Sequence, residues 1–396
     1  LDMTRKVKQR YPHLKTIWGG WHPSLFPHDT VNEPSVDVVV NGQGELPFAM
    51  LLEAIIQDKA FDNIPGIYFK RNGIIVTHPA TSMQDINSFP KINYNLLPVE
   101  KYFKLKGRRQ LDYISSQGCR FRCSFCADPF MYKRGWYGFL PERMGEELEA
   151  LWNEYHFDDV NFQDETFFTN RERVEGIAHE IINRDLKFTW FGTMRADQGA
   201  RMDDELFALC KRSGLRKVMI GIEAGSQQMM DWMKKDIKIE QVYGSAEKCL
   251  RHGIGIIFNI IVGFPNETEA SINESLRVGW DLRRMSRDFE LAVFYFKPYP
   301  GNAIADELLK EGYVFPNGLE AWADFDYVGS TSEWVSEEQH KTVEAFKFYQ
   351  RISLSKKKTF LSPVRKIAAW RCRNKNFKFP VEKKLFELWK PEAKLS

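Results

Sequence analysis

The chain has 396 residues, of which 43% are hydrophobic and 28% charged, a composition typical of a globular protein with material for more than one core. Six cysteines at this length exclude the dense disulfide framework of small secreted proteins, and no run of about 18 apolar residues predicts a membrane helix, so we expect a cytoplasmic protein. The net charge of +3 is uneven, because residues 351–396 carry 14 Lys and Arg against three Glu while the rest of the chain is acidic.

The first 60 residues follow a pattern of strand, turn, strand and helix. Residues 16–20 (TIWGG) indicate a buried strand that enters a glycine turn, and residues 36–40 (VDVVV) indicate a second strand. Residues 41–56 give a Gly-rich turn and an amphipathic helix. The pattern predicts that residues 1–60 form the C-terminal part of a Rossmann-like domain. Because the chain begins at Leu1 in an expected helix, we also expect its natural N-terminus to be missing.

Residues 61–110 contain short strands (GIYFKRNGIIVTH) and proline-rich connections (FPKINYNLLP). We interpret this segment as a linker that crosses between two domains. Residues 301–396 are interpreted as a C-terminal extension that ends in a basic amphipathic tail.

Between residues 111 and 300, a second rhythm alternates six strands with helices. The predicted strands cover 111–117, 159–163, 188–194, 216–222, 256–262 and 290–296. The predicted helices cover 142–155, 171–184, 203–212, 227–252 (expected to be broken) and 268–285. The alternation predicts a partial (β/α)6 barrel, because eight units usually need about 250 residues. Its chemistry is expected in the loops after the carboxyl ends of the strands.

Three of the six cysteines lie close together in GCRFRCSFC, directly after the first predicted barrel strand: Cys119, Cys123 and Cys126. Thiolates suit zinc and iron–sulfur clusters, and closed structural sites of both kinds normally have four protein ligands. The other cysteines stand apart in helical or tail contexts: Cys210, Cys249 and Cys372. Three ligands on a cubane cluster leave one iron open to a substrate or cofactor. The alternative is a zinc site completed by a distant residue.

This Cys-x3-Cys-x2-Cys motif has the aromatic Phe125 just before its last cysteine and follows the first strand of a six-unit barrel. In this context it resembles the radical S-adenosylmethionine (SAM) superfamily. The resemblance implies that the three cysteines bind a [4Fe–4S] cluster, that Phe125 contacts the cofactor, and that SAM chelates the unique iron. It also implies that an external reductant such as flavodoxin or ferredoxin supplies the electron that cleaves SAM to a 5′-deoxyadenosyl radical.

Polar or glycine residues follow the later strands, where the resemblance requires a SAM site. A guanidinium matches the SAM carboxylate, a carboxylate matches its ribose or ammonium group, and glycine lets the backbone approach adenine. By resemblance, Arg195 and Glu223 hold the methionyl or ribose groups and the segment at Gly263 holds adenine. No residue beyond these cofactor contacts is assigned a catalytic role.

Structural alternatives stay open at three strand ends. Asp164 is also placed to cap the helix that follows it or to pair with Arg171. Arg195 is equally consistent with a structural ion pair, and Glu267 with an acid in the first turn of the next helix.

The N-terminal segment resembles the closing part of the cobalamin-binding domain that one subgroup of the superfamily carries. The resemblance rests on WGGWHPSLFPHDTV and VDVVVNGQGELPFAMLLEAI. It implies that Gly19 and Gly20 contact cobalamin, since small residues let a cofactor approach the backbone. The cobalt-ligating DxHxxG signature of other cobalamin proteins is absent from the chain, and His22 is expected to order its loop. The alternative is a cobalamin-type fold that no longer binds the cofactor.

Residues 355–390 interleave Lys and Arg with large apolar side chains. The pattern fits a segment that contacts anionic lipid, an acidic protein face or nucleic acid. The acidic body of the chain argues against nucleic acid. Peripheral membrane contact through this tail, and hence a membrane-associated cytoplasmic protein, is one expectation. A helix packed on the barrel with its lysines exposed is the alternative.

Together these patterns predict an enzyme that cleaves SAM reductively and uses cobalamin to methylate an unactivated carbon. Radical cyclisation, as in anaerobic ring closure on a porphyrin ester, is the alternative within the same subgroup, and a non-catalytic metal-binding scaffold is the alternative from another class. Aromatic residues between 295 and 334 favour a small-molecule or lipid-like substrate, although core packing explains them equally well. Neither the substrate nor the oligomeric state follows from the sequence.

Overall fold

The computed structural model describes residues 1–325, 331–354 and 362–384, and these fall into two compact units. Unit 1 comprises Leu1–Ile92, Ser116–Phe139 and Pro298–Tyr327, and unit 2 comprises Asn93–Ser115, Leu140–Lys297 and Val328–Ser396. The predicted domain boundaries at residues 60, 110 and 300 are linear divisions of the chain, and they stay a prediction.

Unit 2 is built on a six-stranded sheet in which every pair of neighbours is parallel. The strands are β5 (Gln110–Tyr113), β8 (Asp159–Phe162), β9 (Thr189–Thr193), β10 (Leu215–Glu223), β11 (Gly255–Val262) and β12 (Phe289–Tyr295). Their order across the sheet is their order in the chain. The predicted partial barrel is confirmed, and the strands begin and end close to the predicted residues. The exception is the first strand, which ends at Tyr113 because Ser116–Gly118 pairs elsewhere.

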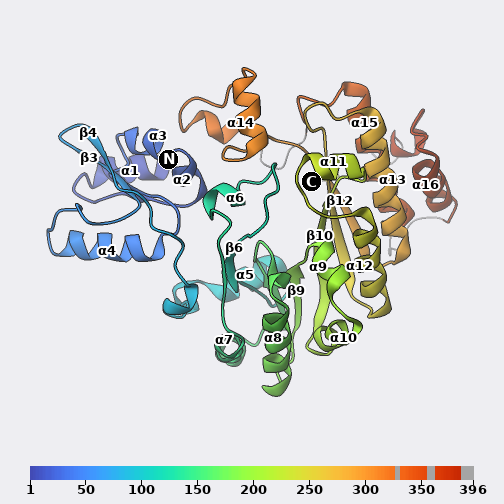
Figure 1. Ribbon diagram of the computed structural model, residues 1–396, viewed down its shortest axis with the longest axis horizontal. Helices are drawn as coiled ribbons and strands as arrows, with labels where there is room; N and C mark the ends of the chain where they lie inside the picture. Colours follow the sequence, from blue (N-terminus) through green and yellow to red (C-terminus); the bar gives the residue numbers. More distant parts are fainter. Residues whose placement is uncertain (326–330, 355–361, 385–396) are drawn as a thin grey trace. The chain divides into compact units, whose positions relative to one another are not determined.

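Helices precede, connect and follow these strands and pack against one another and against the sheet, as Figure 1 shows for unit 2. The helices are α5 (Val99–Lys106), α7 (Pro141–Tyr155), α8 (Arg171–Asn183), α9 (Ala196–Arg201), α10 (Asp204–Arg212), α11 (Gln227–Trp232), α12 (Ile239–Arg251), α13 (Glu269–Met285), α15 (Glu337–Ser353) and α16 (Ser362–Asn374), with 3-10 turns at Tyr94–Leu96 and Phe167–Thr169. Asn170, Asp203 and Thr268 cap α8, α10 and α13 through their side chains. The predicted break within 227–252 separates α11 from α12.

The core of unit 2 lies between the sheet and these helices. Alternate residues of β11, such as Ile256 and Phe258, are fully buried, as expected where one face of a strand packs against helices. Trp190 on β9 is also buried, and its ring centroid lies 5.7 Å from that of Phe162 and 5.2 Å from that of Phe167. The indole Nε1 of Trp190 donates to the carbonyl of Ser213 at 3.1 Å, so its polar atom is satisfied within the core.

Unit 1 contains a four-stranded sheet in the order β1 (Ile17–Trp18), β2 (Val38–Val40), β3 (Ile67–Arg71), β4 (Ile74–Thr77). β1 pairs with β2 in parallel, whereas β3 pairs with β2 and with β4 in antiparallel orientation. Its other elements are α1 (Asp2–Arg10), α2 (Trp21–Leu25), α3 (Pro27–Asn32), α4 (Glu45–Ile56), α6 (Asp128–Met131), α14 (Ala303–Lys310), the strands β6 (Ser116–Gly118) and β7 (Trp136–Gly138), and 3-10 turns at Ile86–Ser88 and Ala321–Asp324.

Successive valines of β2 pack on opposite faces of this sheet. Val38 and Val40 belong to a core with Leu51 of α4, and Val39 belongs to a second core with Val31 of α3. This burial on both faces explains the uninterrupted apolar run of β2. It matches the Rossmann-like layering that the sequence predicts.

The short strands expected in residues 61–110 are β3 and β4. β3 pairs with β2 and β4 pairs with β3, and their apolar residues extend the core of the unit 1 sheet. The assignment of this segment as a linker between domains stays a prediction. The stretch WHPSLFP, for which no helix is predicted, forms α2 and the start of α3. Its prolines lie in the first turns of these helices, where the missing N–H of proline breaks no intrahelical hydrogen bond.

Helix α16 of the basic tail packs against α13 and α15. Ala368 and Cys372 are buried, and the guanidinium of Arg371 pairs with Glu382 at 3.0 Å and lies 5.2 Å from the ring centroid of Tyr349. For this helix the packed alternative is confirmed. The tail segments 355–361 and 385–396 lie outside the described residues, and peripheral membrane contact stays a prediction.

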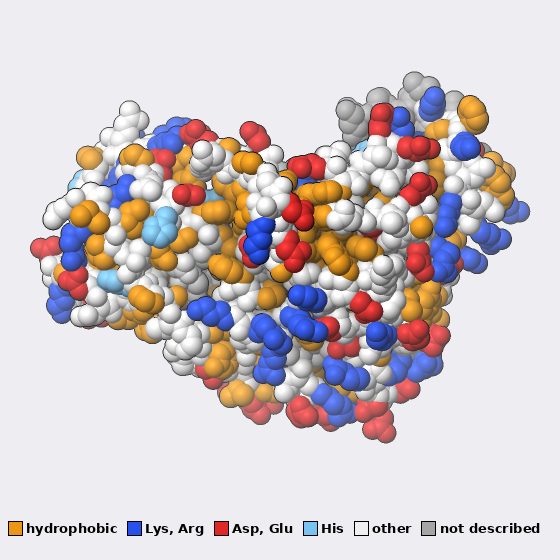
Figure 2. Space-filling model, turned by 45° about the horizontal axis from the view of Figure 1, so that its top comes forward, with side chains coloured by type: hydrophobic (Ala, Val, Ile, Leu, Met, Phe, Trp, Pro, Cys, Tyr) orange, Lys and Arg blue, Asp and Glu red, His pale blue; other side chains and the backbone are white. Residues whose placement is uncertain are grey.

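The surface drawn in Figure 2 mixes basic and acidic side chains. Many charged side chains of the described residues form ion pairs, such as Arg109 with Glu100 and Arg184 with Glu149. In the described ranges, we find no helix with the length and apolar character needed to cross a membrane.

We expect Trp190→Ala to destabilise the protein by about 3–5 kcal/mol, because it removes a large aromatic side chain from a packed core. Trp370→Ala, at a residue that is 52% exposed on α16, should cost less than about 0.5 kcal/mol. Chemical denaturation followed by tryptophan fluorescence measures both. Equal losses for the two variants would contradict this description of the core.

Candidate functional site

The three clustered cysteines lie in a loop of unit 1 between β6 and β7. All six cysteines of the chain are thiols, and Cys123 is buried while Cys119 and Cys126 are half-buried. The backbone N–H of Cys126 donates to the carbonyl of Cys123 at 3.2 Å, which closes a turn. The carbonyl of Ser124 accepts from the N–H of Ile304 on α14 at 3.1 Å. The middle of the loop is thus fixed by its own turn and by α14.

The ends of this cysteine loop are joined by the antiparallel pair β6 and β7, in which Gly118 lies opposite Trp136. Gly118 has a φ of 91°, and a Cβ atom on it would overlap the carbonyl oxygen of Gly135. Only glycine fits this close approach without strain. Two residues after Gly118, the guanidinium of Arg120 lies 5.2 Å from the ring centroid of Trp136.

A second set of contacts links the cysteine loop to the turn before α4. The side chain of Gln117 donates to Glu45 at 2.8 Å and accepts from Gln43 at 3.0 Å. Gln43 also accepts from the backbone N–H of Gln84 at 2.7 Å. These hydrogen bonds connect the Gly-x-Gly-Glu turn (residues 42–45) to β6, the strand that leads into the cysteine loop.

The donor set of the loop fits an iron–sulfur cluster. Burial raises the pKa of Cys126, and the neighbouring Asp128, Cys123 and Cys119 raise it further when charged. A bound iron would reverse this effect, because a coordinating thiol is deprotonated. Within the described part of the chain, no three His, Cys, Asp or Glu side chains are grouped around a single ion. A cubane cluster places each thiolate on a different iron, so its ligands need not converge on one point.

The glycine pair of unit 1 is exposed at the end of β1. Gly20 has a φ of 97° and no atom within 4 Å of the place where a Cβ would stand, and Gly19 lies in ordinary contact with Val40. The ring of His22 packs 5.3 Å from Phe26 and 5.6 Å from Trp322 between ring centroids. Burial lowers the pKa of His22. His22 thus fills space in an aromatic cluster, in keeping with the loop-ordering interpretation.

In unit 2, Glu223 ends β10 in an unusual backbone conformation. Its φ is 68°, which is uncommon for a residue other than glycine, and the pairing of β10 with β11 shifts register between Gly221 and Glu223. The residue is 8% exposed, and its Oε1 accepts from Nζ of Lys235 at 2.7 Å. Local strain of this kind is common at functional sites.

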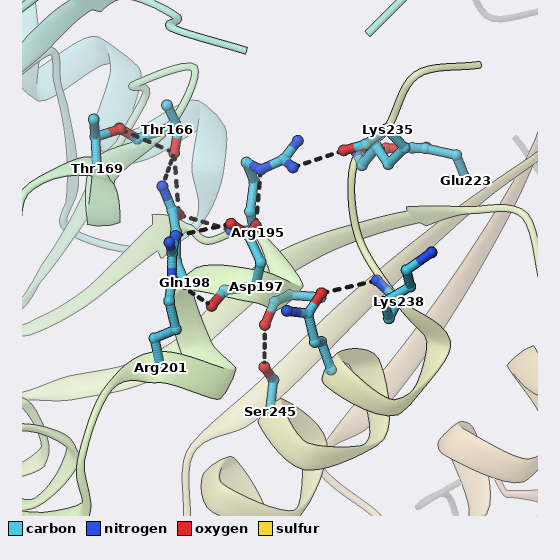
Figure 3. A network of polar contacts seen from close by, with 12 residues as sticks. Thr166, Thr169, Arg195, Asp197, Gln198, Arg201, Glu223, Lys235, Lys238 and Ser245 are labelled. Atoms are coloured by element: carbon cyan, nitrogen blue, oxygen red, sulfur yellow. Dashed lines mark hydrogen bonds and ion pairs between the residues drawn. The ribbon is translucent and has the colours of Figure 1, made fainter. Parts of the chain in front are cut away.

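Arg195 follows β9 and lies in the polar network of Figure 3. Its Nε donates to Oδ1 of Asp197 at 2.9 Å, and its Nη2 donates to the carbonyl of Lys235 at 2.7 Å. Asp197 also pairs with Arg201 at 2.8 Å. The structural ion pair considered for Arg195 therefore exists, and it holds the guanidinium at the carboxyl end of the sheet.

Asp164 follows β8 and takes neither of the two structural roles considered for it. Its carboxylate accepts from the backbone N–H of Ser115 at 2.7 Å and from the Ser115 hydroxyl at 2.6 Å. Asn170 caps α8 instead, and Arg171 pairs with other acids. Arg173, which is buried, donates to the carbonyl of Ser115 at 2.8 Å. Asp164 and Arg173 thus hold Ser115, the residue that directly precedes β6.

Gly263 follows β11 with a φ of 82°, and a Cβ on it would overlap Val335. Its N–H donates to Oε2 of Glu267 at 2.7 Å, and its carbonyl accepts from the Ser332 hydroxyl at 2.8 Å. Glu267 precedes α13 and also accepts from Ser271. Burial raises the pKa of Glu267. Glu267 therefore braces the Gly263 turn, and residues 332–335 make the close approach that glycine allows.

A family model described as the radical SAM superfamily matches residues 113–278. The chain carries a radical SAM domain. The match begins at the last residue of β5, includes the cysteine loop and ends on α13, so it covers the strands β8 to β11 of the unit 2 sheet together with the predicted cluster ligands.

Two relatives show what else the chain resembles. An uncharacterized methyltransferase of Pyrococcus horikoshii is 27% identical over 339 residues, which are 85% of this chain and 72% of that protein. An anaerobic magnesium-protoporphyrin IX monomethyl ester cyclase of Synechocystis is 24% identical over 69% of this chain and 55% of its own length. The chain therefore spans about half to three quarters of the length of these relatives.

The fold resembles that of TsrM, a radical SAM methyltransferase from Kitasatospora setae. One TsrM structure matches with a TM-score of 0.71 and 14% identity over 98% of this chain and 84% of TsrM. A second, with cobalamin and a [4Fe–4S] cluster bound, matches with a TM-score of 0.65 and 17% identity over 78% of this chain and 62% of TsrM. The predicted combination of a partial barrel and a cobalamin-type segment is confirmed as a fold.

Within the radical SAM domain, the structure places Arg195 and Glu223 in one network through Lys235. Gly263 lies on the neighbouring strand end, and Phe125 is half-buried in the cysteine loop of unit 1. Their contacts with SAM stay a prediction, as do cluster binding by the three cysteines and cobalamin contacts of Gly19 and Gly20.

Sequence reasoning missed Lys235, Asp197 and the pair of Ser115 with Arg173. Asp197 lies two residues after Arg195, a spacing at which an acid is a candidate partner of the arginine. Lys235 lies in a stretch whose pattern is typical of a helix surface, and only the predicted break in 227–252 indicated that the chain leaves the helix there.

We expect Gly118→Ala to lower the iron content of the reconstituted protein several-fold, because the new methyl group pushes β6 away from β7 and opens the cysteine loop. Gly73→Ala is the matched control, since Gly73 also has a positive φ but no atom within 4 Å of the position that the new methyl group would take. Iron and sulfide assays after anaerobic reconstitution measure the effect. Full iron loading of Gly118→Ala would contradict the role given to the β6 and β7 pair.

Proposed function

We propose that this chain belongs to an enzyme that cleaves SAM reductively and uses cobalamin to methylate an unactivated carbon. The observation that carries the proposal is the three-cysteine loop at the start of a radical SAM domain. The Rossmann-like layering of unit 1 and the methyltransferase names of the Pyrococcus relative and of TsrM support the cobalamin and methyl-transfer parts.

In this proposal Cys119, Cys123 and Cys126 are the protein ligands of a [4Fe–4S] cluster. When bound, the cluster supplies the electron that cleaves SAM and the iron site that SAM chelates. The chain itself positions the three cysteines. β6, β7 and α14 fix the cysteine loop, and the Gly-x-Gly-Glu turn is hydrogen-bonded to β6, the strand before the loop. The electron comes from a small reductant protein such as flavodoxin or ferredoxin.

The SAM-binding groups are proposed on unit 2. Arg195 matches the methionyl carboxylate, and Glu223 matches the ribose hydroxyls or the ammonium group. The Gly263 turn, braced by Glu267, offers backbone to adenine. Each of these groups is held by a neighbour before SAM arrives, which reduces the ordering that binding requires.

In unit 1, Gly19 and Gly20 are the proposed cobalamin contacts. Both are exposed at the carboxyl end of β1, and Gly20 leaves open space around its Cα. Ligands of open α/β sheets bind outside the carboxyl ends of the strands, which supports this position. The substrate is proposed to be a small or lipid-like molecule, and we propose a cytoplasmic location.

Radical cyclisation is a second candidate, because the magnesium-protoporphyrin cyclase of Synechocystis is also among the relatives. It uses the same SAM cleavage but leaves no methyl group on the product. Product mass separates the two candidates, since methyl transfer adds 14 mass units to the substrate by replacing a hydrogen with CH3, whereas oxidative ring closure removes hydrogen.

We expect Cys123→Ala to lose the brown colour of the reconstituted protein and to form at least about 100-fold less 5′-deoxyadenosine from SAM, because the cluster loses one of three ligands. Cys210→Ala should keep both properties, since Cys210 is buried on α10, in the helix layer of unit 2. Ultraviolet–visible spectra and chromatography of SAM products under anaerobic, reducing conditions measure both. A colourless wild-type protein that contains zinc, or a wild type that leaves SAM intact, would overturn the proposed function.

A further inference from the structure

Lys235 is a buried lysine in the short connection between α11 and α12. It is 7% exposed, and lysine is almost never this deeply buried without a partner. Its neighbours Lys234 and Asp236 both have positive φ angles, of 51° and 54°. The backbone N–H of Lys235 donates to the carbonyl of Met230 at 2.9 Å and so ends α11. The connection thus adopts a strained path that turns the side chain of Lys235 inward.

The connection is fixed from outside by Gln227. The side chain of this residue donates to the carbonyl of Ile237 at 3.0 Å and accepts from the N–H of Ile239 at 3.1 Å. The flanking Met233 and Ile237 are fully buried. Lys235 is therefore presented by an anchored turn, and its position does not depend on a loose side chain.

Lys235 contacts both of the strand-end residues that we propose to bind the methionyl and ribose groups of SAM. Its Nζ donates to Oε1 of Glu223 at 2.7 Å, and its carbonyl accepts from Nη2 of Arg195 at 2.7 Å (Figure 3). Glu223 comes from β10 and Arg195 from the end of β9. One residue thus fixes an acid and a base from neighbouring strands.

Gly221 makes room for this arrangement. A Cβ on Gly221 would overlap Oε1 of Glu223 and would lie 3.2 Å from Nζ of Lys235. The ion pair therefore lies directly over the backbone of β10. The sequence G-I-E, with the lysine 12 residues after the glutamate, encodes the pair.

We infer that Lys235 is a positioning residue of the SAM site, which orients the Glu223 carboxylate through its ammonium group and holds the Arg195 guanidinium through its backbone carbonyl. This inference rests on the proposed function. A buried carboxylate needs a cation nearby to stay charged, and only the charged form accepts hydrogen bonds from two hydroxyl groups or an ammonium group at both oxygens.

The other charged groups at this edge do not replace Lys235. Arg195 is paired with Asp197, which adds a negative charge to the network. Glu267, beyond β11, is a further acid, and it is bonded to the Gly263 turn. Without the ammonium group of Lys235, the Glu223 carboxylate loses the hydrogen bond that fixes its orientation.

The test compares Lys235→Met with wild type, Lys235→Arg and Lys238→Met, all with the cluster reconstituted anaerobically. Lys238→Met is the matched control, because the Lys238 side chain is 61% exposed and pairs only loosely with Asp231. Equilibrium dialysis with radiolabelled SAM at pH 7 gives the Kd of each protein. Thermal unfolding of each protein reports its fold.

We expect Lys235→Met to raise the Kd for SAM at least about tenfold at pH 7, the scale of one lost hydrogen bond to a charged group. Lys235→Arg should restore the Kd to within about threefold, because it keeps a cation beside Glu223, and Lys238→Met should match wild type. A Lys235→Met protein that unfolds at the wild-type temperature but binds SAM weakly, with recovery in Lys235→Arg, separates positioning from a merely structural role.

If Lys235→Met is too unstable to assay, Glu223→Gln combined with Lys235→Met replaces the buried pair by neutral groups and keeps the protein folded. This double variant should bind SAM as weakly as Glu223→Gln alone, at least about tenfold more weakly than wild type, because the Lys235 ammonium group acts through Glu223. With SAM bound by wild type, wild-type affinity in Lys235→Met overturns the inference alone. So does a double variant whose Kd differs more than about threefold from that of Glu223→Gln. A wild type that binds no SAM overturns the proposed function and the inference with it.

Discussion

The parallel pairing of the six strands in unit 2 is the constraint on which the candidate site depends. Because neighbouring strands run in the same direction and follow chain order, all of their carboxyl ends lie along one edge of the sheet. Asp164, Arg195 and Glu223 therefore come from different parts of the sequence but lie on successive strand ends. The helices between the strands pack on the sheet and bury its apolar side chains. Polar side chains therefore lie mainly at the edge formed by the carboxyl ends of the strands.

Polar groups at this edge are each satisfied by a neighbour. Asp164 bonds Ser115, Glu223 bonds Lys235, and Glu267 bonds the Gly263 turn. An unpaired charge in such a buried setting is strongly destabilising, and a pair with full hydrogen bonding is tolerated. The same contacts orient the side chains before a ligand binds, which is how folded proteins prepare sites for charged ligands. Stability of the edge and preparation of the site thus use the same contacts.

The fold could be predicted from sequence because its signals are periodic. Runs of β-branched and aromatic residues predicted the strands β8 to β12. The expected break in 227–252 predicted the turn that carries Lys235. Other features depend on contacts between distant residues, which a sequence pattern does not encode. Two examples are the pairing of β3 with β2 and the hydrogen bond between Asp164 and Ser115. The spacing of Cys119, Cys123 and Cys126 identified the family, whereas the partners of Arg195 needed coordinates.

The central claim is that three thiolates hold a cluster with one iron open to SAM. Electron paramagnetic resonance of the reduced, anaerobically reconstituted protein tests it most directly, with SAM labelled by 17O in its carboxylate. The account predicts a [4Fe–4S] signal whose g values shift when SAM is added and whose lines broaden with the 17O label, because the carboxylate binds iron. A [4Fe–4S] signal that SAM leaves unchanged would mean that the fourth iron position is closed, and it would contradict the account.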